Sequence, residues 1–190
     1  LLRGLAQFGL AADRPTLLVF GGSLGAQRLN QTIPAIWPEL ADRGVQVLHL
    51  CGAGKSVEVE TAVGQPAYVV REYVDQMETA YAVADLVVGR AGANTVSELT
   101  ALAIPAVYVP LAFGNGEQRL NAGEAVRAGA AHLVENAAFT PEWINDELVP
   151  LLRDRARLVK MSANAASIGV LDGADRMVAL VREALAGRVN

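Results

Sequence analysis

Hydrophobic residues along this chain fall into short, nearly continuous apolar runs separated by longer segments with helical spacing. The runs predict six strands, at residues 16–20, 45–50, 67–70, 85–89, 106–110 and 131–134. Because these runs do not alternate with polar residues, they indicate strands that are buried on both faces, as in a parallel sheet covered by helices.

The segments between the runs predict the helices. They lie at residues 25–42, 55–63, 76–83, 94–102, 117–128, 141–151, 154–167 and 172–187. In the last helix the apolar residues share one face, and we expect Asp172 to cap its N-terminus. Regular alternation of strands and helices predicts an α/β fold with a doubly wound parallel sheet, formed by one domain over residues 1–190.

Composition narrows the classes of partner. The formal net charge of −4 argues against nucleic acid and against a polybasic membrane contact. The single cysteine, Cys51, excludes a disulfide within the chain and favours a reducing compartment. The longest apolar run, at 104–113, is too short to span a membrane. The chain does not begin with Met, so we expect one domain of a longer protein.

Ligands of doubly wound sheets bind beyond the carboxyl ends of the strands, so the loops there are the candidates. GGSLGAQ (21–27) follows the first strand and combines glycines, Ser23 and a helix N-terminus. It suits a phosphate group, and the alternative is a tight turn with a serine cap. Its glycine spacing does not match G-x-G-x-x-G, which disfavours NAD.

CGAGKS (51–56) resembles a P-loop, but His49 replaces the first glycine, which favours a turn into a helix.

Three later loops carry further candidates. After the third strand, Tyr73 and Val74 could face a flat base, or could merely pack on the sheet. In GRAGANTVSE (89–98), Gly92 permits close approach to the backbone, and Glu98 could accept from both hydroxyls of a cis-diol. The alternative is that Glu98 only complements the helix dipole. After the fifth strand, polar residues at 117–121 suit sugar hydroxyls, or could simply cap a solvated loop.

Four motifs together resemble the C-terminal half of the MurG family, the N-acetylglucosaminyltransferases that make lipid II. They are GGSLGAQRLN, REYVDQM, GRAGANTVSEL and GNGEQRLNA, and the last is similar to the actinobacterial form. The resemblance implies the Rossmann-like, donor-binding half of a GT-B glycosyltransferase. It also implies UDP-N-acetylglucosamine as donor, lipid I as acceptor, and neither a metal nor a cofactor.

The resemblance further implies that the acceptor domain, the catalytic base and the membrane contact belong to an N-terminal domain absent from this chain. The full-length protein is then expected to be cytoplasmic and peripheral on the inner face of the plasma membrane, with no direct membrane insertion by this domain. Two alternatives stay open. One is a stand-alone UDP-sugar-binding module without catalysis. The other, which four ordered motifs disfavour, is another GT-B enzyme such as a natural-product glycosyltransferase or a UDP-N-acetylglucosamine epimerase.

Carried over by motif, the resemblance implies a role for each candidate residue. Ser23, Ala93, Asn94 and Thr95 would contact the diphosphate, Tyr73 and Val74 the uracil, Glu98 the ribose, and Glu117, Gln118 and Asn121 the N-acetylglucosamine. The chain departs from the family at three places. Ala91 replaces a serine of some members, Glu117 stands where others have Gln or His, and residues 122–131 lack a more usual proline-containing run.

Overall fold

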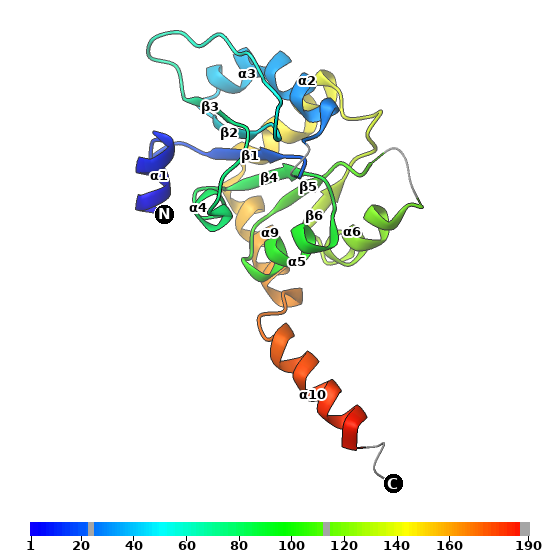
Figure 1. Cartoon of the computed structure of the whole chain (residues 1–190). Helices are drawn as coiled ribbons and strands as arrows, with labels where there is room; N and C mark the ends of the chain where they lie inside the picture. The colour runs from blue at the N-terminus through cyan, green and yellow to red at the C-terminus, as the bar shows by residue number, and fades with distance from the viewer. Residues whose placement is uncertain (23–24, 112–114, 187–190) are drawn as a thin grey trace.

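The computed structural model describes residues 1–22, 25–111 and 115–186. Its centre is a six-stranded sheet in which every neighbouring pair is parallel (Figure 1). The strands are β1 (Thr16–Phe20), β2 (Gln46–Leu50), β3 (Tyr68–Arg71), β4 (Leu86–Gly89), β5 (Ala106–Tyr108) and β6 (Ala131–Leu133). Their order, β3-β2-β1-β4-β5-β6, confirms the predicted doubly wound α/β fold.

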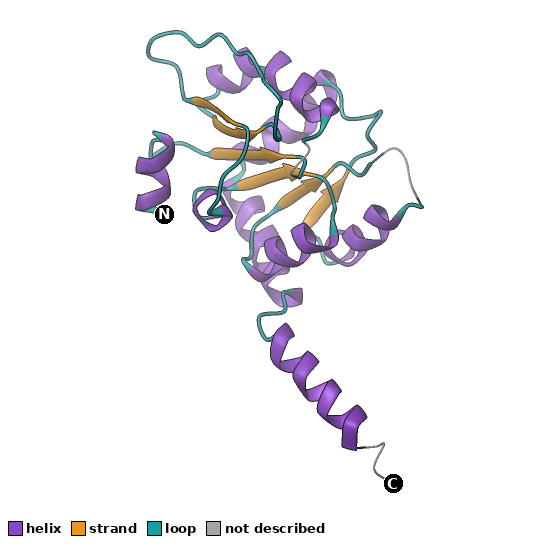
Figure 2. Cartoon of the chain, viewed as in Figure 1, coloured by secondary structure: helices purple, strands orange, loops and turns teal. Residues whose placement is uncertain are grey.

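Helices cover both faces of the sheet (Figure 2). One core contains residues of α2 (Gln27–Ala35), α3 (Trp37–Asp42), the π-helical segment η1 (Ile144–Leu148) and α8 (Val149–Arg153). The other contains residues of α1 (Leu2–Phe8), α4 (Met77–Tyr81), α5 (Ala93–Ala101) and α6 (Glu117–Arg127), while α9 (Arg155–Ile168) contributes to both. Successive residues of β1 alternate between the two cores, which explains the continuous apolar run.

The predicted helix at 25–42 is in fact two helices, α2 and α3. The chain leaves helical geometry at Ile36, with φ −107° and ψ 12°. Pro38 has no N–H to donate, and its ring would clash with the carbonyl group of Pro34 in a continuous helix. The break therefore follows from proline.

The predicted helix at 55–63 is wrong. These residues form neither helix nor strand, and Val63 is fully exposed. Valine and glutamate alternate from Val57 to Glu60, which gives a period of two and no helical apolar face. Only Val59 of this segment packs against the core, so no helix connects β2 to β3.

The C-terminal helices have the predicted positions. The helical stretch at 141–151 extends to Arg153, from α7 (Pro141–Trp143) through η1 into α8. The last helix, α10 (Gly173–Ala186), projects away from the sheet and its covering helices (Figure 1). Its predicted apolar face is exposed, with Met177 at 62% and Val181 at 51%. Asp172 precedes it, and its carboxylate pairs with the Arg176 guanidinium at 2.8 Å.

Candidate functional site

The order of the strands reverses between β1 and β4, so the loops that follow them leave the sheet side by side. Phe20 and Gly89 are register partners at the carboxyl ends of these strands. A Cβ atom on Gly89 would lie 2.9 Å from the Phe20 carbonyl oxygen, so glycine permits this close approach. The fold thus brings GGSLGAQ and GRAGANTVSE together at the switch point, where ligands of such sheets bind.

Gly22 and Gly25, in the loop between β1 and α2, are joined by a backbone hydrogen bond. The N–H of Gly25 donates to the carbonyl oxygen of Gly22 at 2.9 Å. Gly25 has φ +71°, and a Cβ atom there would lie 2.0 Å from the carbonyl oxygen of Cys51. Ala26 is the N-cap of α2 and has no capping side chain, which leaves N–H groups at this helix end without that partner. Ser23 lies outside the described residues.

The loop after β4 opens onto a second helix N-terminus. Gly92 is the N-cap of α5, and it also lacks a side-chain cap. Ala93 and Asn94 are exposed at the first turn, and Thr95 is half-buried. These small residues leave the N–H groups and the positive dipole end of α5 accessible, as an anionic group requires.

Glu98 lies one turn further along α5, and a hydrogen bond fixes its carboxylate. The Tyr81 hydroxyl of α4 donates to Oε2 of Glu98 at 2.7 Å. The Tyr81 ring is buried against Phe20, with the ring centroids 6.1 Å apart. Burial and the bond to Glu98 raise the pKa of Tyr81 far above its ordinary value, so the phenol stays a donor. The Glu98 side chain is therefore held toward α4.

Tyr73 and Val74, the two residues expected to contact a nucleotide base, follow β3 and differ in exposure. Val74 is half-buried and packs against the same core as Tyr81. Tyr73 is 63% exposed, so the alternative in which it merely packs on the sheet is wrong. An exposed aromatic ring beside the strand ends is available for stacking.

The start of α6 presents polar residues around a cavity of about 310 Å³. Glu117 is exposed and Gln118 is half-buried, and both line this cavity. The Gln118 Oε1 atom accepts from the N–H of Leu111 at 3.0 Å, and among the described residues its NH₂ group has no hydrogen-bond acceptor. The Asn121 Nδ2 atom donates to the carbonyl oxygen of Ala91 at 3.0 Å, so this amide joins α6 to the loop after β4.

Ala91, the first departure from the family pattern, is fully buried. Its methyl group belongs to the core beneath the loop. A hydroxyl at this position would consequently be enclosed by protein in this conformation.

Arg90 is a site residue to which the motif analysis gave no role. Its Nη1 atom donates to the carbonyl oxygens of Val109 and Pro110 and to Oδ1 of Asn136, each at 2.8 Å. Arg28 holds the same segment by donating to the carbonyl oxygen of Asn136 at 2.8 Å. An arginine directly after a buried strand was the available signal, because a half-buried guanidinium needs several acceptors.

Hydrogen bonds link the buried His49 ring to the residues that contact the loop after β1. The Nε2 atom of His49 lies 3.0 Å from Oδ1 of Asn30, and its Nδ1 atom lies 2.7 Å from the Tyr68 hydroxyl. Asn30 in turn donates to the carbonyl oxygen of Cys51 at 2.9 Å, the atom that Gly25 approaches. Burial lowers the pKa of His49 to about 4, so the ring is neutral at pH 7.

The P-loop-like segment CGAGKS is a turn, as predicted, but no helix follows it. The N–H of Lys55 donates to the carbonyl oxygen of Gly52 at 3.1 Å, and the Lys55 side chain is exposed. Over residues 1–22, 25–111 and 115–186, no cluster of three His, Cys, Asp or Glu side chains suits a metal ion. In the same ranges, no helix combines the length and apolar character needed to cross a membrane.

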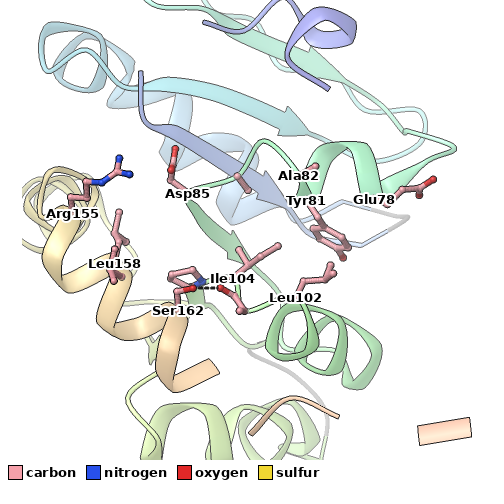
Figure 3. A pocket seen from close by; sticks show the side chains of 13 residues that line it. Glu78, Tyr81, Ala82, Asp85, Leu102, Ile104, Arg155, Leu158 and Ser162 are labelled. Atoms are coloured by element: carbon pink, nitrogen blue, oxygen red, sulfur yellow. Dashed lines mark hydrogen bonds between the residues drawn. The ribbon is translucent and has the colours of Figure 1, made fainter. Parts of the chain in front are cut away.

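A cavity of about 480 Å³ lies at the amino edge of the sheet, and Tyr81, the partner of Glu98, is among the residues that line it (Figure 3). Asp85 and Pro105, which line it, immediately precede β4 and β5. The N-termini of α2 and α5, whose N-cap residues make no side-chain cap, lie at the carboxyl edge, whereas the α9 N-terminus beside this cavity is capped by the Asp154 side chain. We therefore place the candidate site at the carboxyl edge.

The match to a family model decides the classification. The model described as "Glycosyltransferase family 28 C-terminal domain" matches residues 16–177. The chain belongs to this family. This confirms the Rossmann-like fold expected from the four motifs.

Relatives and solved structures agree with this classification. The chain is 54% identical over 181 residues to a Leifsonia xyli protein named UDP-N-acetylglucosamine--N-acetylmuramyl-(pentapeptide) pyrophosphoryl-undecaprenol N-acetylglucosamine transferase, covering 95% of the chain and 50% of that protein. A Streptomyces coelicolor protein of the same name is 48% identical, with 97% and 51% covered. The crystal structure of Acinetobacter baumannii MurG matches with a TM-score of 0.82 and 28% identity, covering 95% of the chain and 53% of that structure.

The chain thus spans about half the length of the curated relatives it matches. A putative UDP-N-acetylglucosamine 2-epimerase from Listeria monocytogenes matches with a TM-score of 0.67 at 13% identity, over 93% of this chain and 46% of that one. At that identity, the likeness shows the shared fold alone.

Proposed function

We propose that this chain is the donor-binding domain of an inverting N-acetylglucosaminyltransferase that uses UDP-N-acetylglucosamine. The observation that carries the proposal is the switch point. There, the N-cap residues of α2 and α5 make no side-chain cap, and α5 also carries Glu98, whose carboxylate is held in place by Tyr81. A diphosphate suits the helix N-termini, and a ribose cis-diol suits a fixed carboxylate. Membership of glycosyltransferase family 28 supports this assignment.

Each candidate residue has a role in this proposal. The N–H groups at Ala93, Asn94 and Thr95 bind the diphosphate, together with Ser23. Tyr73 stacks on the uracil, and backbone groups of Val74 read its edge. Glu98 accepts from the ribose hydroxyls. The sugar hydroxyls bind Glu117, the NH₂ group of Gln118, and the Oδ1 atom of Asn121, whose NH₂ group is engaged within the protein.

Transfer follows from the charge that develops on the leaving group. The 4-hydroxyl oxygen of the acceptor attacks C1 of N-acetylglucosamine, and the bond from C1 to the diphosphate oxygen breaks. The electron pair of that bond leaves with UDP, while a base outside this chain takes the hydroxyl proton. N–H groups aimed at the diphosphate stabilise the growing negative charge without moving, which is the largest contribution a fixed site can make.

The acceptor and the location are also part of the proposal. The curated relatives are named for a lipid-linked N-acetylmuramyl-pentapeptide acceptor, so we propose lipid I as the acceptor and lipid II as the product. The acceptor domain and the base then belong to the half of the protein outside these 190 residues. The whole protein is peripheral on the cytoplasmic face of the plasma membrane, where lipid I is used.

Calorimetric titration of the 190-residue chain tests donor binding. UDP-N-acetylglucosamine and UDP should bind, whereas GDP-mannose should give no heat at the same millimolar concentration. Glu98→Ala should weaken UDP more than 2′,3′-dideoxy-UDP. Glu78→Ala, which removes a first-turn glutamate of neighbouring α4, serves as control and should change neither. Equal losses for both nucleotides in Glu98→Ala would leave only a helix-dipole role.

A second experiment separates the enzyme from a stand-alone binding module. Protein that includes the region preceding this chain should transfer labelled N-acetylglucosamine from its UDP donor to a lipid I analogue. Donor binding without any transfer would favour the module.

A further inference from the structure

Glu98 has one side-chain partner in the described part of the chain, the Tyr81 hydroxyl. The bond occupies one lone pair of Oε2 and leaves Oε1 and the remaining lone pair of Oε2 for other donors. Glu98 itself is exposed, whereas Tyr81 is buried. A buried donor therefore holds an exposed acceptor.

An unrestrained glutamate on a helix surface samples several rotamers, and fixing it on ligand binding costs conformational entropy. The bond from Tyr81 orders the carboxylate before the ligand binds, so less conformational entropy is lost on binding and the affinity is higher. The Tyr81 ring is itself fixed by Phe20, and α4 is joined to the sheet core through Ala80. Tyr81, packed in the core, thereby restricts the orientation of the Glu98 carboxylate.

We propose that Tyr81 is a positioning residue for nucleotide recognition, which sets Glu98 in the orientation that accepts a ribose cis-diol. This inference rests on the proposed function, because it assigns the ribose to Glu98. Tyr81 itself touches no ligand. Its hydroxyl acts through Glu98, and it selects ribose over sugars that lack vicinal hydroxyls.

The test uses Tyr81→Phe, which removes one hydroxyl and keeps the ring against Phe20. Dissociation constants for UDP and for 2′,3′-dideoxy-UDP are measured on the same preparation of the 190-residue chain. Their ratio reports ribose recognition, and it does not depend on any loss of stability because both ligands meet the same folded molecules. We expect Tyr81→Phe to weaken UDP about fivefold and to leave 2′,3′-dideoxy-UDP within about twofold.

Two further variants complete the experiment. In a Glu98→Ala background, Tyr81→Phe should have no additional effect on UDP, since the positioned group is gone. Tyr108→Phe is the matched control, because Tyr108 is a buried tyrosine of the same core and makes no hydrogen bond to Glu98. It should leave the ratio unchanged.

The outcomes distinguish a failure of the positioning role of Tyr81 from a failure of the proposed function. If Glu98→Ala abolishes the preference for UDP while Tyr81→Phe keeps it, the proposed function stands and the positioning role is overturned. A Tyr81→Phe variant that weakens both nucleotides equally also overturns it, because a merely structural tyrosine would do the same. Absence of UDP binding by the wild-type chain, or an unchanged ratio in Glu98→Ala, overturns the ribose assignment and this inference with it.

Discussion

The side-chain amide of Asn121 donates a hydrogen bond to the carbonyl oxygen of Ala91, at 3.0 Å. This bond joins the second turn of α6 to the loop between β4 and α5. Two segments that supply candidate ligand contacts are therefore fixed to one another, although 30 residues separate them along the chain. The relationship gives Asn121 a structural role alongside its proposed contact with the sugar.

Asn121→Ala should lower the free energy of unfolding by about 1–2 kcal/mol, because the carbonyl group of the buried residue Ala91 loses its donor. Urea denaturation measures the change. Asn164→Ala is a matched control, since Asn164 is also helical and also donates to a backbone carbonyl, that of Gly129, but at an exposed site. The control should change stability by less than about 0.5 kcal/mol. Equal losses in the two variants would show that the bond from Asn121 contributes no more to the free energy of unfolding than an exposed one.

Gly25→Ala should be much more destabilising than Gly22→Ala. Both glycines have positive φ, +71° and +86°, so both substitutions strain the backbone by about 1 kcal/mol. Only at Gly25 would the new Cβ atom meet another group, the Cys51 carbonyl oxygen at 2.0 Å. We expect about 2 kcal/mol of additional loss from this overlap, measured by chemical denaturation. Similar losses at the two positions would mean that the loop relaxes freely.

Arg90→Ala should cost about 3 kcal/mol of stability, because two carbonyl groups and the Asn136 side chain lose a charged donor together. Arg119→Ala provides the comparison. Arg119 pairs with Glu135, but both side chains are about half exposed, so this loss should stay below about 1 kcal/mol. Thermal melts of both variants report the difference. An Arg90→Ala variant as stable as the wild type would contradict the network.

Stability should fall as the pH drops from about 6.5 to about 4, partly through His49. Burial depresses the pKa of this ring to about 4 in the folded state, against 6.5 in the unfolded chain. The unfolded state therefore binds the proton first, and the contribution present above pH 6.5 is lost progressively as pH falls toward 4, up to about 3 kcal/mol.

His49→Gln removes the titrating group and keeps a polar side chain between Asn30 and Tyr68. Its unfolding free energy should vary less between pH 6.5 and 4 than that of the wild type, as measured by urea denaturation across that range. Carboxylates contribute equally to both proteins and cancel in the comparison. Parallel pH profiles would show that His49 does not titrate in this way.

Local sequence patterns predicted most of the fold because each depends on near neighbours. Continuous apolar runs identified the six strands, and the four inner strands are buried throughout, as a run without polar alternation predicts. The edge strands β3 and β6 are only half-buried, so for these two the prediction of burial on both faces is wrong. The prediction of a helix at 55–63 is wrong, because valine and glutamate alternate there and leave no helical apolar face. The single helix predicted at 25–42 is divided into α2 and α3, because Pro38 cannot continue a helix from α2.

The sequence by itself determined the strand-end loops, their glycines and the polar residues they present, because backbone freedom and side-chain chemistry are local properties. Tertiary structure alone decided which of these groups meet. The partnership of Tyr81 with Glu98, the bond from Asn121 to Ala91 and the acceptors of Arg90 all join different elements. Such pairs depend on strand order and register, which arise from the packing of the whole sheet and are encoded in no single motif.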